Sequence, residues 1–565
     1  MDLPRRLRWA EPSSVNAAAD ARASLLGRLA SESFDVLVIG GGATGAGIAR
    51  DAALRGLAVA LVDAGDFASQ TSSHSSKLIH GGLRYLQYGD LPLVFEGLRE
   101  RRRLMSTAPH LCRPIEFVFP AYQGERPGLA ELGAGVALYN ALALWRPPAT
   151  GHRLNAHGLY RLAPHLRAAG LTGAQLYVDC QTDDARLVLE NVLDATAAGA
   201  ACANYVRVEA IRRDRQGRAR GALVADGETG ARFEVRARVV VSATGPFTDG
   251  FLGGPRRLRP TLGVHLVLDA ARVPHGGRAL VLRTPQDNRL YFVLPAGPRT
   301  IVGTTDTDLA PAEAPGRAPR VGDEIRAHGS DVDYLLAALN HAFPSLRLGP
   351  GDVVSTFAGL RPLLAGHAQT PSETSREHTI AAAPDRTVVV AGGKLTTLRR
   401  MGEETVDVVV EMLRASGLER ALAPCATGTR PLPGATGDPA PPSQILEDQP
   451  TDLRMRLTCY GGRAAAVLDL ARRPELAERI DPNLPYLWAE VLHAARFEQV
   501  VKLTDVLVRR VPLFRDAGDQ GLAAAEPAAR LVGAERGWSA ERRDAELATY
   551  RQAVAVSRRW RDETS

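Results

Sequence analysis

Short apolar runs that stop at glycines or at an acidic residue are the clearest pattern in this chain. VLVI (36–39) and AVALV (58–62) are aliphatic and largely β-branched, which is typical of parallel strands buried on both faces. The segment between them, from about Gly45 to Arg55, is predicted to be a helix. The pattern therefore indicates a strand–helix–strand unit, and similar buried strands are expected at 239–242 and 387–390.

Other segments predict strands joined by polar turns. The stretches 203–226 and 291–303 each contain two such strands around a turn rich in glycine, proline or charged residues. A Pro/Gly-rich segment at 424–444 is predicted to be a linker, and the Ala, Leu and Arg positions beyond it recur with a helical period. We therefore expect a helical domain at the C-terminal end.

One apolar run could interact with lipid. LGAGVALYNALALW, Leu132 to Trp145, is shorter than the roughly 20 residues that span a bilayer. It is therefore expected to be either a packed helix or a segment that rests on a membrane surface.

Composition narrows the classes of function. A chain of 565 residues is too long for one compact core, so two or three domains are expected. Contents of 45% apolar and 23% charged residues are ordinary for a globular protein. The net charge is +6, but the basic residues are scattered, so we expect no nucleic-acid partner. The five cysteines form no CxxC pair, which predicts reduced thiols, a cytoplasmic setting and no metal site. No apolar segment follows the arginines near the N-terminus, so no signal peptide is expected.

Lysine is rare in this chain. Among 69 basic residues the lysines are Lys77, Lys394 and Lys502. A lysine retained among so many arginines indicates a position that needs a compact ammonium group. The alternative is that the positions of these three lysines are due to chance. Two of the three lie in glycine-rich segments, which makes Lys77 and Lys394 candidates for a binding site.

The first strand leads directly into a dinucleotide-binding pattern. Gly40, Gly42 and Gly45 form G-x-G-x-x-G, which allows a tight turn, a close approach of a pyrophosphate and close helix–strand packing. The following helix directs its N-terminal N–H groups at the phosphates. Asp63 ends the second strand and is placed to accept hydrogen bonds from ribose hydroxyls.

Later segments are predicted to complete the site. TSSHSSKLIHGGLRY (71–85) follows the second strand, which favours a flavoprotein over an NAD enzyme. Small residues at Ala243 and Gly245 and a backbone contact at Val208 suit a cofactor, and GGKLTT (392–397) offers a second helix N-terminus. A cationic pocket for a phosphorylated substrate is expected from Arg84, Arg361, Arg376 and Lys394.

These motifs resemble the aerobic, FAD-dependent sn-glycerol-3-phosphate dehydrogenases. VIGGGATGAGIARDAALRGL, TSSHSSKLIHGGLRYL, YVDCQTDDARLVLEN, ATGP, LGVHLVL, VGTTDTD, GLRPL and GGKLTTLRR occur in the family's order between about 34 and 412, and a weaker resemblance continues beyond. The resemblance implies FAD, oxidation of glycerol 3-phosphate to dihydroxyacetone phosphate by hydride transfer to the flavin, and a membrane quinone as acceptor. It also implies peripheral association with the inner face of the cell membrane and allows a homodimer.

The resemblance also assigns residues to roles. His265 is favoured as the base, with His80 as second choice, and Arg361 assists catalysis. Three positions depart from the family pattern: Phe247, Leu262 and His74. The implied substrate contacts are Arg84, Tyr85, Thr304, Arg361, Arg376 and Lys394. The implied cofactor contacts are Gly40, Gly42, Gly45, Asp63, Ser72, Ser73, Ser76, Lys77, His80, Gly81, Gly82, Val208, Ala243, Gly245, Gly393, Lys394, Leu395 and Thr396.

The expected fold is α/β, with a Rossmann-like FAD-binding domain interleaved with an antiparallel β-sheet substrate domain, plus a C-terminal all-helical domain. The expected boundaries are an N-terminal extension at 1–33, the interleaved domains at 34–420, a linker at 421–445 and the helical domain at 446–565. Two other functions stay open at this point, a glycerol-3-phosphate oxidase that uses O2 and a non-redox flavin-binding protein.

Overall fold

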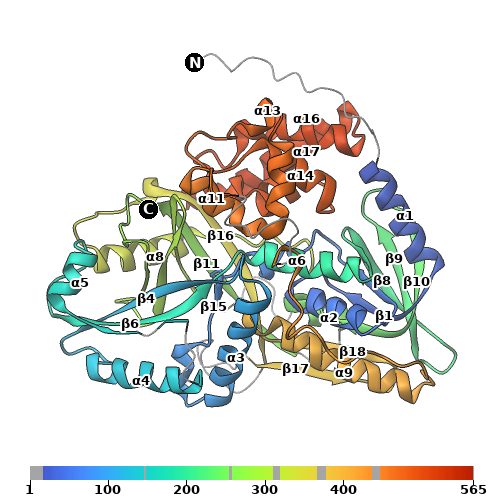
Figure 1. The fold of residues 1–565 in the computed structure, drawn as a ribbon, viewed down its shortest axis with the longest axis horizontal. Helices are drawn as coiled ribbons and strands as arrows, with labels where there is room; N and C mark the ends of the chain where they lie inside the picture. Colours follow the sequence, from blue (N-terminus) through green and yellow to red (C-terminus); the bar gives the residue numbers. More distant parts are fainter. Residues whose placement is uncertain are drawn as a thin grey trace.

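The computed structural model describes residues 17–144, 148–149, 151–253, 257–308, 318–365, 377–435 and 446–563. Arg376 and parts of the predicted extension and linker lie outside these ranges. The α/β class, the two interleaved sheets and the helical C-terminal domain are confirmed (Figure 1).

The first sheet contains the parallel strands that the apolar runs predict. β10, β1, β2 and β7 lie side by side and parallel, and β18 pairs with the other edge of β10. Its eight strands, counted over the described residues, are β1 (Ser33–Ile39), β2 (Val59–Val62), β7 (Ala201–Ala203), β8 (Val206–Arg213), β9 (Ala219–Asp226), β10 (Arg232–Ser242), β17 (His378–Ala382) and β18 (Thr387–Gly392).

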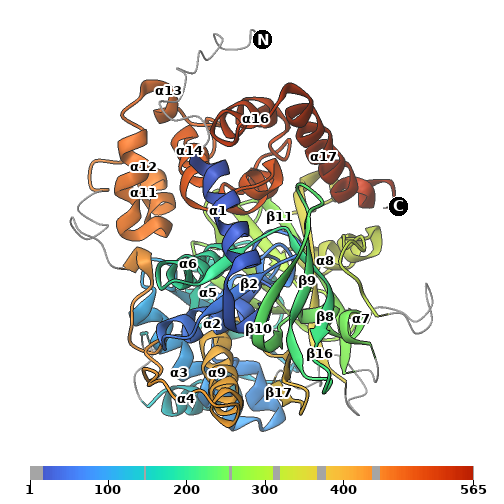
Figure 2. The ribbon, with the colours of Figure 1, turned by 90° about the vertical axis from the view of Figure 1, so that its right-hand side faces the viewer.

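Both faces of this sheet are covered, which explains why β1 lacks polar alternation. Val36 and Val38 pack on one face, against α2 (Ala43–Leu54), α6 (Asp184–Ala197) and α9 (Leu398–Ala415). Leu37 and Ile39 pack on the other, with α1 (Ala17–Ser31) and the β8–β9 hairpin. Figure 2 shows α1 running along this side next to β10.

The second sheet is mostly antiparallel, with β12 and β4 as a parallel pair. β11 and β16 form its longest pairing, and β4 and β6 its next longest. Its ten strands, counted over the described residues, are β3 (Leu78–Ile79), β4 (Arg113–Tyr122), β5 (Arg153–Asn155), β6 (Leu171–Gln181), β11 (Leu258–Asp269), β12 (Ala279–Arg283), β13 (Leu290–Ala296), β14 (Arg299–Gly303), β15 (Thr307–Asp308) and β16 (Val353–Leu364).

Helices cover this sheet on both faces as well. α5 (Ala156–Leu162) and α8 (Gly329–Ala342) pack on one face. α3 (Leu91–Thr107) and α4 (Leu129–Leu142) pack on the other. α4 contains most of the apolar run 132–145 noted in the sequence, of which Trp145 lies outside the described residues. Leu132, Val136 and Tyr139 of α4 are buried, whereas Leu138 is exposed. None of the helices in the described part of the chain is long and apolar enough to cross a bilayer.

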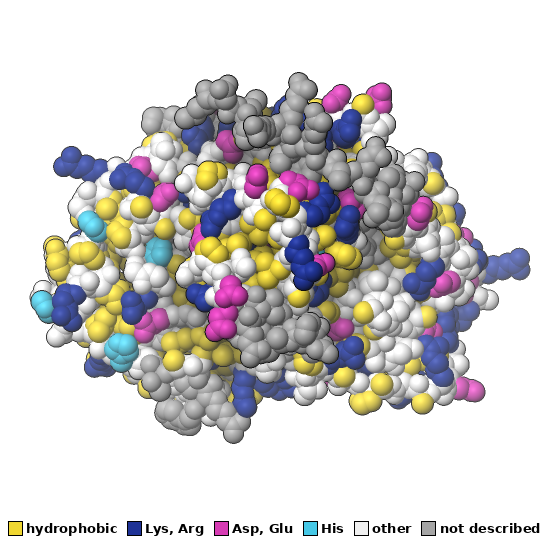
Figure 3. All heavy atoms as spheres, turned by 45° about the horizontal axis from the view of Figure 1, so that its top comes forward, with side chains coloured by type: hydrophobic (Ala, Val, Ile, Leu, Met, Phe, Trp, Pro, Cys, Tyr) yellow, Lys and Arg dark blue, Asp and Glu magenta, His cyan; other side chains and the backbone are white. Residues whose placement is uncertain are grey.

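The C-terminal domain lies across the top of both sheets in Figure 1. Its core continues into α3 through Leu104, into the turn after α3 through Leu111, and into α6 through Leu187. Figure 3 views the molecule with this top brought forward, and the basic side chains drawn there are scattered among acidic ones. The helices are α11 (Thr451–Leu457), α12 (Ala464–Leu470), α13 (Pro474–Ala477), α14 (Trp488–Phe497), α15 (Leu513–Asp516), α16 (Leu522–Arg536) and α17 (Ala540–Arg558), with a π-helical turn η9 (Asp505–Arg510).

Candidate active site

A cavity of about 990 Å³ lies between the two sheets. One wall is made by the carboxyl ends of β1, β2 and β10, which is where open α/β sheets bind ligands. The opposite wall is made by β11, β13 and β16 of the second sheet. The volume is at the upper end for ligand pockets, so the cavity has room for a dinucleotide and a small substrate.

The glycine turn after β1 shows why the sequence uses glycine there. Gly40 has a φ of +106°, and a Cβ on it would lie 2.5 Å from the carbonyl oxygen of Ala243. A Cβ on Gly45 would lie 1.8 Å from the carbonyl oxygen of Gly40, so the helix can approach the strand only through glycine. Gly42 caps α2 without a side chain, and residues 42–44 line the cavity, so the helix N-terminus faces it.

Asp63 ends β2 on the cavity wall. Its Oδ2 accepts a hydrogen bond from the Gly41 amide at 2.6 Å, and its Oδ1 accepts one from Gly65 at 2.7 Å. Burial raises the pKa of Asp63 to about 6, although both amides act to lower it. The remaining acceptor positions of the carboxylate are available to hydroxyl donors in the cavity.

Binding of FAD should weaken as the pH falls through about 6. The ionised carboxylate of Asp63 is the better acceptor for ribose hydroxyls, so protonation opposes binding, and the dissociation constant should rise by up to about tenfold per pH unit below 6. Titration of the cofactor-free protein with FAD, followed by flavin fluorescence, measures this. Asp63→Asn should bind FAD more weakly with a flatter pH dependence, and an unchanged slope in that variant would assign the effect to another group.

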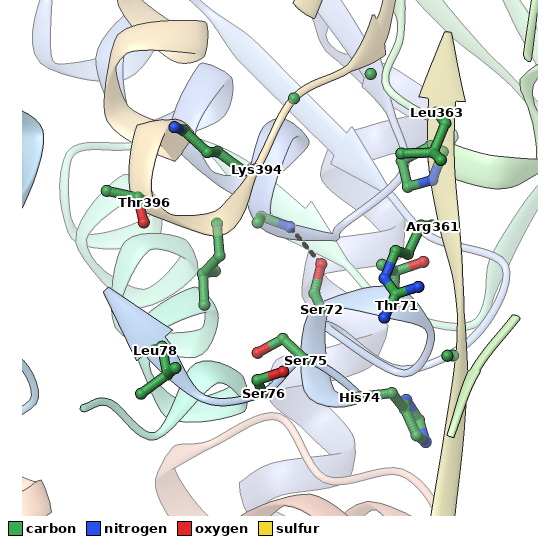
Figure 4. Close-up of a pocket in the computed structure, with 18 of the residues that line it drawn as sticks. Thr71, Ser72, His74, Ser75, Ser76, Leu78, Arg361, Leu363, Lys394 and Thr396 are labelled. Carbon is green, nitrogen blue, oxygen red and sulfur yellow. Dashed lines mark hydrogen bonds between the residues drawn. The ribbon is translucent and has the colours of Figure 1, made fainter. Parts of the chain in front are cut away.

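The segment 71–85 runs from the first sheet to the second. The Thr71 hydroxyl donates to the Leu360 carbonyl of β16 at 2.6 Å, and Ser72 Oγ accepts from the Ala43 amide at the start of α2 at 2.9 Å. Figure 4 shows Ser72, Ser75 and Ser76 between Arg361 on one side and Lys394 and Thr396 on the other. The hydroxyls therefore tie the two walls together where they face the cavity.

Lys77 lies outside this wall. Its ammonium is 2.5 Å from Asp184 Oδ1 of α6 and donates to the Ser73 carbonyl at 3.1 Å. The sequence predicts Lys77 along the cofactor, but its buried ion pair instead anchors the segment to α6. A guanidinium at this position would be bulkier, which agrees with the retention of lysine here.

Arg361 faces the cavity from β16 in a fixed orientation. Its Nη1 is 2.6 Å from Asp306 Oδ1, and its Nη2 donates to Thr304 Oγ1 at 2.9 Å. Asp306 also pairs with Arg289 at 3.0 Å, so two guanidinium groups share one buried carboxylate. This arrangement fixes the guanidinium of Arg361 at this end of the cavity.

A second group of cations lies on the opposite wall. The Lys394 ammonium is 4.9 Å from the centre of the Tyr85 ring, and the Arg84 guanidinium carbon is 5.8 Å from the same ring. Figure 4 places Arg361 and Lys394 on opposite sides of the serine segment. Among the described residues, the predicted cations therefore form two groups on opposite sides of the cavity, Arg361 on one side and Lys394 with Arg84 on the other.

His265 of β11 lies next to Arg361 and is buried. Its ring stacks on Phe357 with centres 4.6 Å apart, and its Nε2 is 2.9 Å from Ser76 Oγ. Burial lowers the pKa of His265 well below its ordinary value, and Arg361 and Lys77 lower it further by charge repulsion. The imidazole is therefore neutral at physiological pH, and one of its ring nitrogens carries a free lone pair.

The Gly81–Gly82 turn is held from behind by a buried network. The Gly81 amide donates to Tyr139 Oη at 2.8 Å, and the Tyr139 hydroxyl donates to Asp179 at 2.8 Å. Asp179 also pairs with Arg101 of α3. The sequence assigns no role to these residues, nor to Asp306 and Phe357, because their partners lie far along the chain.

The three departures from the family pattern occupy distinct places. His74 lines the cavity, and its Nδ1 lies 2.7 Å from the Gln70 carbonyl oxygen, which fixes the serine segment locally. Phe247 also lines the cavity and is packed in the core beside α8. Leu262 is buried in the same core.

Most predicted site residues meet in this one cavity, while Gly45, Ser73, Lys77 and Gly81 lie behind its wall. A glycine turn at a helix N-terminus, an acid at the end of β2 and the Gly392–Gly393 pair on the cavity wall fit FAD. The predicted residues that line it are Gly40, Gly42, Asp63, Ser72, Ser76, His80, Gly82, Arg84, Tyr85, Val208, Ala243, Gly245, His265, Thr304, Arg361, Gly393, Lys394, Leu395 and Thr396.

Similarity to known proteins agrees with this geometry. Residues 35–408 match the model of the FAD dependent oxidoreductases, and residues 425–543 match the C-terminal domain of alpha-glycerophosphate oxidase. The glycerol-3-phosphate dehydrogenase of Synechocystis sp. is 34% identical over 92% of this chain and 96% of that protein. The aerobic glycerol-3-phosphate dehydrogenase of Staphylococcus aureus is 33% identical over 85% of this chain and 87% of that protein.

One solved structure extends the similarity to the whole fold. The glycerol-3-phosphate dehydrogenase of Bacillus halodurans, complexed with FAD, aligns with a TM-score of 0.76 and 30% identity over 95% of this chain and 98% of that chain. FAD is accordingly the cofactor of this protein. The chain belongs to the FAD-dependent glycerol-3-phosphate dehydrogenase family.

Proposed function

We propose that this protein oxidises sn-glycerol 3-phosphate to dihydroxyacetone phosphate and passes the electrons to a membrane quinone. The observation that carries the proposal is Arg361, held by Asp306 and Thr304, beside the neutral base His265 in the cavity that takes FAD. A guanidinium in a fixed orientation suits a phosphate, and a neutral imidazole suits removal of a hydroxyl proton.

In this proposal the phosphate binds at Arg361 and Thr304, while Lys394, with Arg84 and Tyr85 beside it, contacts the substrate from the other side of the cavity. Binding both ends fixes the carbon that reacts, which contributes much of the rate. Arg376 is a further proposed contact, although it lies outside the described residues. FAD, when bound, supplies the hydride acceptor.

The proton would leave through Ser76 and His265. Ser76 Oγ lies on the cavity wall and is 2.9 Å from His265 Nε2, so the hydroxyl can pass a substrate proton to the ring. The Nδ1 atom is buried and has no hydrogen-bond partner among the described residues, and a hydrogen on Nδ1 leaves Nε2 as the acceptor. His80 is the alternative base on the same wall.

Exposed apolar residues support a membrane-bound acceptor. Leu91 and Phe95 of α3 are exposed, as are Leu138 of α4 and Leu144 just beyond it. Leu138 also lines the cavity, so this apolar surface borders the opening. Large apolar side chains gathered beside a site are typical of contact with a lipid surface or an apolar ligand.

Glycerol 3-phosphate should bleach the flavin under anaerobic conditions. If the cavity binds this substrate as proposed, the absorbance of the oxidised flavin near 450 nm should be lost in a single turnover. At a typical turnover number of about 10 s⁻¹, this takes on the order of 0.1 s. Glycerol without the phosphate should bleach it far more slowly, because it lacks the group that Arg361 binds. Equal bleaching by both compounds would show that the site does not recognise the phosphate group. No bleaching by either compound would favour a non-redox role.

A second candidate is an oxidase that reduces O2 to hydrogen peroxide. The match of residues 425–543 to the C-terminal domain of alpha-glycerophosphate oxidase favours this alternative. Peroxide production measured with and without a soluble quinone separates the two. Rapid turnover with oxygen alone would replace the quinone in the proposal.

A further inference from the structure

The loop 63–70 turns one side to the cavity and the other to the C-terminal domain. Asp63, Gly65 and Ser69 line the cavity. Asp66 points the other way and is 1% exposed. The loop therefore separates the cofactor cavity from the C-terminal helical domain and contacts both.

Asp66 is the centre of a buried ion cluster. Its carboxylate accepts from Arg509 Nε at 2.6 Å, from Arg510 Nη2 at 3.0 Å and from Asn204 Nδ2 at 3.0 Å. Arg510 also donates to the Glu498 carbonyl at 3.0 Å. Burial acts to raise the pKa of Asp66, but Arg510 and Arg509 hold it below its ordinary value, so the carboxylate is ionised.

A second carboxylate completes the cluster from the C-terminal side. Asp505 accepts from Arg509 Nη2 at 2.8 Å and from the Tyr205 hydroxyl at 2.5 Å. The Tyr205 amide in turn donates to the Gly65 carbonyl at 2.9 Å. Both arginines of η9 are thus joined to the cofactor loop through Asp66, and Arg509 is also joined to it through Asp505 and Tyr205.

We propose that Arg509 and Arg510 are positioning residues for FAD, which hold the ribose-binding loop in place from the C-terminal domain. Neither lines the cavity, so they act through Asp66 and the backbone of the loop. By linkage, FAD must stabilise the attachment of the C-terminal domain as much as that domain stabilises FAD binding. The inference rests on the assignment of the Asp63 loop to FAD and does not depend on the substrate or on the electron acceptor.

The test is release of FAD from the holoenzyme of Arg510→Met, a variant of similar volume without the charge. Flavin fluorescence after serial dilution gives the dissociation constant, and thermal unfolding with and without added FAD gives the stabilisation by the cofactor. We expect the dissociation constant to rise by about tenfold, within the roughly 5- to 150-fold range typical of coupled sites, and the FAD-dependent stabilisation to shrink.

Arg463→Met is the matched control. Arg463 pairs with the buried Glu190 of α6, so its loss also breaks an ion pair between the C-terminal domain and the rest of the chain. It should lower stability without changing the dissociation constant of FAD. If both variants release FAD equally, or if Arg510→Met retains it fully, the inference is wrong.

Arg509→Met provides a second variant if Arg510→Met does not fold. It keeps the contact of Arg510 with Asp66 and should give a smaller rise in the FAD dissociation constant. Combining it with Asp66→Asn tests the path, because the two effects on FAD release should be less than additive if Arg509 acts through Asp66. Full additivity would contradict that path.

Discussion

Arg361→Ala should lower kcat/KM for glycerol 3-phosphate by about 10³-fold while the protein keeps its oxidised flavin spectrum. Loss of one partner of a hydrogen-bonded charge pair costs about 4 kcal/mol, and each 1.4 kcal/mol corresponds to a factor of ten. The fold should survive, because Asp306 keeps Arg289 at 3.0 Å and the Thr261 hydroxyl at 2.8 Å. Steady-state kinetics with a dye or quinone acceptor measure the loss.

Two further variants show whether this loss reports phosphate recognition. Arg361→Lys restores the charge but not the two-pronged geometry, so it should recover only part of the activity. Arg259→Ala is the matched control, since Arg259 lies on the neighbouring strand, pairs with Asp308 at 2.7 Å and does not line the cavity. Wild-type kinetics for Arg361→Ala would remove this residue from the substrate site.

His265→Gln should reduce kcat by about 10²- to 10⁴-fold, the contribution typical of a positioned general base. Glutamine can still accept a hydrogen bond from Ser76 but cannot take up the proton. The variant should bind FAD and show normal flavin absorbance, because the ring of His265 stacks on Phe357 and lies within the second sheet. His80→Gln serves as the comparison, and a larger loss in that variant would transfer the role of base to His80.

The pH dependence gives an independent check on His265. Its pKa lies well below the ordinary value of 6.5, so the free enzyme keeps the imidazole neutral as the pH falls through that value. The ionisation of the substrate phosphate affects both enzymes equally. Its effect on the pH profile therefore cancels when kcat/KM of the wild type is divided by that of His265→Gln. We expect this ratio to stay constant near pH 6.5, whereas an unperturbed histidine would make it fall by about tenfold per pH unit below that point.

The parts of the fold that the sequence predicts are those whose cause is local. The strand that ends at Gly40, the helix after it and the acid at Asp63 follow from apolar runs, glycine geometry and chain spacing. The helical C-terminal domain follows from a period of 3.6 residues. In each of these cases the residues that specify the structure are neighbours in the chain.

The features that the sequence does not predict depend on distant partners. Lys77 pairs with Asp184, Arg361 shares Asp306 with Arg289, and Asp66 binds arginines more than 400 residues away. An ion pair leaves no periodic pattern in the chain, so an isolated Asp or Arg cannot be assigned to a partner before the fold is known. This explains why Lys77 is predicted along the cofactor, whereas in the structure its ammonium pairs with Asp184 and does not line the cavity.

The order in which the strands pair has a consequence for synthesis of the protein. β1 is made early, but its parallel partner β10 follows roughly 200 residues later, a delay of about 10–40 s at ordinary rates of translation. During that time the aliphatic edge of β1 is open on the growing chain, with only β2 available beside it. The ribosome-bound intermediate therefore carries an exposed, aggregation-prone edge and is a natural client for chaperones that shield nascent chains.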